Sequence, residues 1–160
     1  MQALPQTRGC FVCGAYNPVG FKLELTENQQ RVESQFQFKP EHCGFPEVVH
    51  GGLITTILDE TMAWTVGVCA QKFAYCAELT VRFLRPIAPG TDMVARGEMI
   101  ENKRGRLFLV RAEIVNLQGD LMAEASGKFL PLPEEGQRSM RSEFIQDPTP
   151  VLGPAAGKLL

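Results

Sequence analysis

The sequence predicts an α+β fold in which an antiparallel sheet wraps around one long helix. Residues 51–70 contain no proline and place apolar side chains nearly all round a helix, which is typical of a helix buried on most sides. Strand-like alternation of apolar and polar residues precedes this segment and recurs in longer segments after it. A single helix followed by clustered strands favours α+β over an alternating parallel fold.

The expected strands differ in the strength of their patterns. The clearest alternation lies in residues 21–26, where Phe21, Leu23 and Leu25 alternate with polar residues. Gln118-Gly119-Asp120 is a hairpin signal between the last two strands. Residues 40–49 contain turn formers and are expected to form a loop. In chain order, the predicted strands cover residues 21–26, 32–39, 77–84, 93–101, 107–117 and 121–130.

The composition fits one globular domain. The chain has 160 residues, 44% of them hydrophobic and 21% charged, with a formal net charge of -2. We expect the domain to cover residues 1–130. The proline-rich residues 131–160 show little periodicity and are expected to be a flexible or loosely docked tail. The charge balance gives no general attraction for nucleic acid.

The five cysteines are expected to be reduced. Their number is odd, and residues 1–9 lack the apolar segment of a secretory signal. The uncharged runs within residues 48–77 are shorter than a membrane span requires. These features predict a cytoplasmic protein that has no membrane partner.

Asp59 is the first candidate for chemistry. It lies in the middle of the predicted helix, and only Thr55 and Thr56 share its face as hydrogen-bond donors. A buried carboxylate without partners is costly, so such groups are often functional. The alternative is that Asp59 and Glu60 mark an exposed side of the helix.

His50-Gly51-Gly52 stands at the start of the same helix. Helix N-termini present backbone N–H groups without partners, and glycines leave these groups accessible. Such donors can stabilise a carbonyl oxygen as it becomes an oxyanion. A glycine-rich loop selected for close packing is the alternative interpretation.

Taken together, these features identify a resemblance. The segments VHGGLITTILDE (residues 49–60) and LTVRFLRP (residues 79–86) closely resemble the hotdog-fold acyl-CoA thioesterase superfamily. CFVCG (residues 10–14) and NPVG (residues 17–20) resemble more narrowly the branch that includes the phenylacetate-pathway thioesterases. The resemblance covers roughly residues 8–131.

The resemblance implies hydrolysis of acyl-CoA thioesters by a homodimer or a dimer of dimers (a homotetramer), without a metal or another cofactor. By this resemblance, the Gly51 N–H polarises the thioester carbonyl, and Asp59 of the opposite protomer acts as general base or nucleophile. His50 helps to orient the site or contacts the thioester region. Gly52, Thr56 and the residue at 76 would contact the substrate. The basic candidates for the CoA phosphates are Arg82, Arg85 and Arg104.

The sequence departs from the family pattern at two positions. Relatives often carry Asn or Gln where this chain has Gly44, and many carry Ser or Thr where it has Cys76. A thiol is a weak hydrogen-bond donor, so Cys76 would hold the attacking water or the carboxylate less well than Ser or Thr. This difference leaves the rate of hydrolysis and the identity of the substrate open.

Several alternatives stay open at this level. Cys10 and Cys13 are either buried apolar cysteines, a redox pair, or half of a zinc site completed by His42 and Cys43. The competing functions are a non-catalytic acyl-CoA-binding module and a hotdog dehydratase or hydratase.

Overall fold

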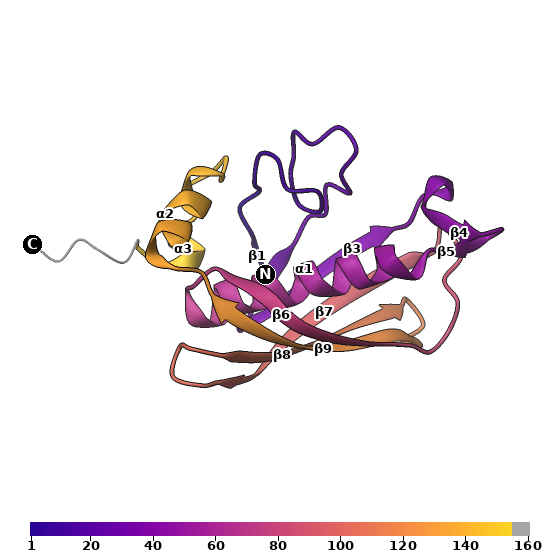
Figure 1. Cartoon of the computed structure of the whole chain (residues 1–160). Coiled ribbons are helices and arrows are strands. Elements are labelled where there is room, and N and C mark those ends of the chain that lie inside the picture. Colours follow the sequence, from indigo (N-terminus) through magenta and orange to yellow (C-terminus); the bar gives the residue numbers. More distant parts are fainter. Residues whose placement is uncertain (155–160) are drawn as a thin grey trace, which may run out of the picture.

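The computed structural model describes residues 1–154 and is organised around helix α1 (Gly51–Ala70), which crosses one face of a seven-stranded sheet (Figure 1). The strand order is β1-β2-β3-β7-β8-β9-β6, and every neighbouring pair is antiparallel. The α+β prediction is therefore confirmed. The strands are β1 (Gln2–Ala3), β2 (Thr26–Asn28), β3 (Arg31–Gln37), β6 (Ala74–Phe83), β7 (Asp92–Asn102), β8 (Phe108–Asn116) and β9 (Leu121–Pro131).

Helix α1 supplies the centre of the core. Ile57, Leu58 and Met62 have no exposed surface, and they pack with the inward side chains of the sheet. Among the described residues, α1 is the one helix long and apolar enough to cross a membrane by length and composition. Half of its most apolar window is buried inside the fold, so packing against the sheet accounts for this composition.

The strand predicted at residues 21–26 is wrong for most of its length. Leu23 and Leu25 are buried as the alternation predicted, but Lys22 has a φ of 53° and interrupts extended backbone. The backbone bonds instead run to the N-terminal segment: Leu23 N–H donates to the Val12 carbonyl at 2.8 Å. Only residues 26–28 join the sheet, as β2.

The predicted loop at residues 40–49 has structure of its own. It contains the 3₁₀ turn η1 (Pro40–His42) and a small hairpin of β4 (Cys43–Phe45) and β5 (Val48–Val49). Glu47 turns the hairpin with a φ of 62°. Val49 N–H donates to the Ile87 carbonyl, which fixes the hairpin next to the start of α1.

The C-terminal segment, expected to be a flexible or loosely docked tail, contains two short helices in its described part. It forms α2 (Glu134–Ser142) and α3 (Thr149–Leu152) at the end of α1 opposite the β4–β5 hairpin (Figure 1). Phe144 is buried against Trp64 and Phe73, and Leu152 is 1% exposed. Isolated apolar residues among prolines thus dock this segment without a periodic pattern. Residues 155–160 lie outside the described part.

Candidate active site

At the start of α1, the N–H groups of Gly51 and Gly52 differ in their hydrogen bonding. His50 is the N-cap, with extended backbone (φ −64°, ψ 129°), and its Nδ1 accepts a hydrogen bond from the Gly52 N–H at 2.9 Å. The Gly51 N–H has no hydrogen-bond partner among the described residues. Only Gly51 therefore offers a free donor to a ligand, whereas the backbone donor of Gly52 is occupied.

A groove of about 430 Å³ opens beside Gly51. Its walls come from the β4–β5 hairpin, the first turn of α1, and residues 83–87. Phe83 is 54% exposed in this groove, and a β-carbon added at Gly51 would lie 3.3 Å from its ring. Arg85 lies at the same groove in an ion pair with Asp120. The groove is mainly apolar and can accept an acyl chain next to the free donor.

Gly44 lies directly against His50. A β-carbon at position 44 would approach the His50 Cδ2 to 2.9 Å and its Cα to 3.2 Å. The Asn or Gln that the family resemblance leads us to expect at this position would therefore require a different placement of His50. The departure at Gly44 thus has a local structural consequence.

Asp59 carries a buried oxygen without a partner. Its Oδ1 has no hydrogen bond within the described chain. Thr55 and Thr56 donate to the Gly51 and Gly52 carbonyls at 2.9 Å, so neither threonine serves Asp59. Burial raises the pKa of the Asp59 carboxyl, and the nearby Cys76 thiol opposes part of that rise. The structure thus brings Asp59 and Cys76 together.

Gly51 and Asp59 of one protomer do not face a common point. They are eight residues apart on one helix, which corresponds to about 12 Å along its axis. Asp59 also does not line the groove beside Gly51. A carbonyl held by the Gly51 N–H is therefore out of reach of the Asp59 carboxylate in the same chain.

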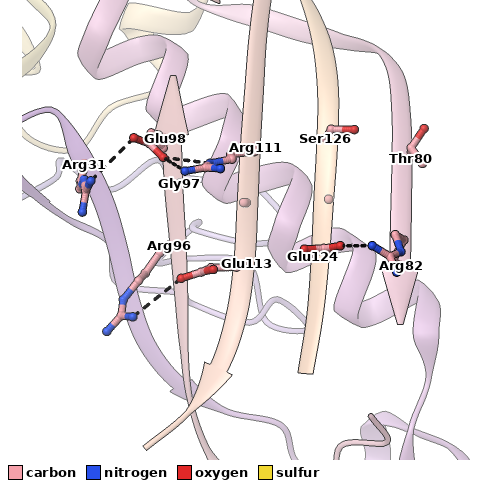
Figure 2. A pocket seen from close by; sticks show the side chains of 12 residues that line it. Arg31, Thr80, Arg82, Arg96, Gly97, Glu98, Arg111, Glu113, Glu124 and Ser126 are labelled. Atoms are coloured by element: carbon pink, nitrogen blue, oxygen red, sulfur yellow. Dashed lines mark hydrogen bonds and ion pairs between the residues drawn. The ribbon is translucent and has the colours of Figure 1, made fainter. Parts of the chain in front are cut away.

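The predicted arginines lie in separate places. Arg82 belongs to a charged groove of about 400 Å³ on the other face of the sheet from α1 (Figure 2), where it pairs with Glu124 at 2.7 Å. Figure 2 shows further ion pairs along this face, such as Arg96 with Glu113. Arg104 lies in the β7–β8 turn, near the C-terminal end of α1. Neither Arg82 nor Arg104 reaches the Gly51 groove of its own protomer.

The zinc alternative with His42 and Cys43 does not assemble in the structure. The His42 Nδ1 accepts from the Lys39 N–H at 3.0 Å, and its ring packs against Phe21. Among the described residues, the acidic group that meets Cys10 and Cys13 is instead Glu60, which was not predicted as a site residue. Its nearest signal in the sequence is its position next to Asp59 on the buried helix.

Known proteins are similar to this chain in sequence and in fold. A sequence model of the thioesterase superfamily matches residues 47–123, which include the start of α1 and Asp59. The fold and these matches agree with the resemblance in the sequence. Over residues 47–123 the chain is similar to the thioesterase superfamily, and its fold is the hotdog fold of these proteins.

Two relatives share the name Acyl-coenzyme A thioesterase THEM4. The Mus musculus protein is 31% identical over 122 residues, which cover 73% of this chain and 51% of the relative. The Bos taurus protein is 27% identical over 128 residues, covering 78% of this chain and 52% of the relative. The chain thus spans about half the length of these relatives.

Solved structures share the fold. A thioesterase superfamily protein superposes with a TM-score of 0.71 at 22% identity, covering 77% of this chain and 63% of the other. The E. coli PaaI protein from the phenylacetic acid degradation operon gives 0.64 at 18% identity, with 70% and 80% covered. The smu.793 protein of Streptococcus mutans, solved bound to acetyl CoA, gives 0.63 at 15% identity, with 69% and 88% covered.

Proposed function

We propose that this chain hydrolyses an acyl-CoA thioester to a free acid and CoA. One observation carries the proposal: among residues 1–154, the Gly51 N–H at an apolar groove has no partner, and neither has the buried Oδ1 of Asp59. The names of the two relatives, and the acetyl CoA bound to a structural neighbour, support an acyl-CoA substrate.

The reaction follows from these two groups. The Gly51 N–H donates to the thioester oxygen and stabilises the negative charge that develops as the carbonyl carbon is attacked. Asp59 takes a proton from water, and the resulting hydroxide adds to that carbon. Collapse of the intermediate breaks the carbon–sulfur bond and releases CoA, whose sulfur receives a proton. Direct attack by the Asp59 carboxylate is the alternative. No metal or cofactor takes part in either route.

The site requires two protomers. Since Asp59 lies about 12 Å along α1 from Gly51, we infer that the Gly51 donor of one protomer meets the Asp59 of a second copy. Strand β6 is the last strand of the described sheet and exposes Tyr75 and Phe83, so it offers a surface for that copy. A homodimer, or a dimer of dimers, then contains two equivalent sites.

The candidates for the CoA phosphates are Arg85 and Arg104. Arg85 lies at the Gly51 groove, and its exposed ion pair with Asp120 is weak enough to be exchanged for a phosphate. Arg104 of a second copy is the further candidate. Arg82 is removed from this proposal because it lies on the other face of the sheet. A cytoplasmic location stays a prediction.

Thiol release from aryl, short-chain and long-chain acyl-CoAs tests the proposal. Asp59→Asn should lower kcat by about 10²- to 10⁴-fold, the usual contribution of a general base, and leave CoA affinity unchanged in calorimetry. Glu113→Gln, on the outer face of the sheet, is the matched control and should retain wild-type rates. If wild type and Asp59→Asn release thiol equally slowly, the chain is a binding module and the hydrolase proposal is wrong.

A further inference from the structure

Cys10 and Cys13 lie in a loop whose geometry suits metal binding. The Val12 N–H donates to Cys10 Sγ at 3.3 Å, and the Gly14 N–H donates to the Cys10 carbonyl at 3.0 Å. A β-carbon at Gly14 would lie 2.3 Å from that carbonyl, so only glycine permits this tight turn. Backbone N–H groups directed at a cysteine sulfur stabilise its thiolate, which is the form that binds metal.

Helix α1 brings Glu60 to the same point. The Glu60 oxygens lie 3.8 and 3.9 Å from Cys10 Sγ, and the ligand atoms of Cys10, Cys13 and Glu60 all lie within 4.8 Å of one another. In a tetrahedral zinc site, two sulfurs are separated by about 3.8 Å, and a sulfur and an oxygen by about 3.5 Å. Movements of a few tenths of an ångström to about one ångström therefore bring all three donors onto one ion.

Cys10, Cys13 and Glu60 form a cluster of acidic groups, and no basic residue pairs with them in the described chain. Within the described chain, no lysine, arginine or histidine lines the cavity that borders these three residues, and none forms an ion pair with Glu60. Three neighbouring groups that are anionic when deprotonated need a cation or must keep their protons. These groups lie between the N-terminal loop and α1, where Cys13 is buried, so an uncompensated negative charge there is costly.

Neighbouring side chains hold the donors in place. The Trp64 Nε1–H donates to Glu60 Oε1 at 3.1 Å, and the Thr7 hydroxyl lies 3.4 Å from Cys13 Sγ. Such outer contacts orient ligands in metal sites. A cavity of about 150 Å³ borders all three donors, and it has room for water as a fourth ligand.

We propose that Cys10, Cys13 and Glu60 bind one Zn²⁺, which fastens the N-terminal loop to helix α1. Two thiolates and a carboxylate suit zinc better than a hard cation such as Mg²⁺ or Ca²⁺. Binding displaces the remaining thiol and carboxyl protons into solvent. In this proposal Glu60 takes the place that the zinc alternative gave to His42 and Cys43. The ion has no role in hydrolysis, so the proposal stands or falls independently of the thioesterase activity.

The zinc content of the 160-residue chain tests the proposal. The reduced protein, reconstituted with one equivalent of Zn²⁺ and desalted, should retain about one zinc per chain by mass spectrometry. Co²⁺ in its place should show thiolate charge-transfer absorption. Cys10→Ser, Cys13→Ser and Glu60→Gln should each lower the retained zinc at least tenfold. Cys43→Ser, the control for the His42–Cys43 alternative, should retain it.

Circular dichroism of each variant separates loss of the ligand from loss of the fold, and Glu60→Gln is the conservative change if a serine variant unfolds. If the reduced wild-type protein does not bind zinc, the proposal is wrong. If that protein instead forms a disulfide between Cys10 and Cys13 on oxidation, the pair belongs to redox chemistry. If Glu60→Gln retains all of its zinc, Glu60 is not a zinc ligand, and the proposed three-residue site is wrong.

Discussion

At the scale of residues, Gly51 and Gly52 are neighbours, but only the Gly52 N–H has a hydrogen-bond partner among the described residues. His50 Nδ1 accepts from the Gly52 N–H, whereas the Gly51 N–H has no partner among the described residues. The sequence predicted a donor at this helix start. It could not distinguish the two glycines, because the difference depends on the position of the His50 ring, which Gly44 allows to lie close.

Gly51→Pro removes this donor with little change in the helix. Proline is tolerated at the first helical position, and the extended backbone of His50 is what a residue before proline requires. We expect kcat to fall by about 10²- to 10³-fold, as after removal of other oxyanion donors. Gly51→Ala keeps the N–H and is the control. Equal kcat values for the two variants would contradict the assigned role.

Cys76→Ser tests the departure from the family pattern. Burial raises the pKa of the Cys76 thiol to about 11, so it stays a neutral, weak donor beside Asp59 at ordinary pH. A serine hydroxyl donates more strongly, and a bond worth about 1 kcal/mol should raise kcat about fivefold. Cys69→Ser, whose sulfur faces the Gln30 carbonyl, is the control. A lower kcat in Cys76→Ser would show that the thiol is preferred.

At the scale of elements, the alternation rule failed where a buried segment pairs with a loop. Leu23 is buried as a strand residue would be, but its N–H bonds to Val12 in the N-terminal segment, which no local pattern reveals. Helix α1 was predicted well because continuous apolar residues without proline leave few other structures. Glu60 was missed because its importance depends on Cys10 and Cys13, which are remote in sequence.

The C-terminal segment gives a prediction about stability. Leu152 is 1% exposed, and a β-carbon added at Gly67 of α1 would lie 3.3 Å from its Cδ2. Leu152→Ala should lower the free energy of unfolding by about 2 to 4 kcal/mol, because it removes buried methyl groups and leaves a cavity. Chemical denaturation measures this change, with the half-buried Val151→Ala as control. A loss below about 0.5 kcal/mol, typical of a surface position, would favour the loosely docked tail.

At the scale of the whole molecule, the separation between Gly51 and Asp59 along α1 determines what one chain can do. In the proposed dimer each protomer would contribute its Gly51 to one site and its Asp59 to the other, so hydrolysis would require dimerisation. The sequence predicted both residues, but it did not show whether the two residues of one chain can reach the same bound substrate. The resemblance in the sequence already implied that Asp59 comes from the opposite protomer, and the structure adds that Asp59 does not line the Gly51 groove of its own chain.

Complementation between two inactive variants tests this account most directly. In a mixed dimer of Gly51→Pro and Asp59→Asn chains, one site combines the intact Gly51 of one chain with the intact Asp59 of the other. Random pairing of equal amounts should therefore restore about a quarter of wild-type activity. Each variant alone should stay inactive. If mixed dimers form, as mass spectrometry can verify, and no thioesterase activity returns, the site does not combine Gly51 and Asp59 from different protomers.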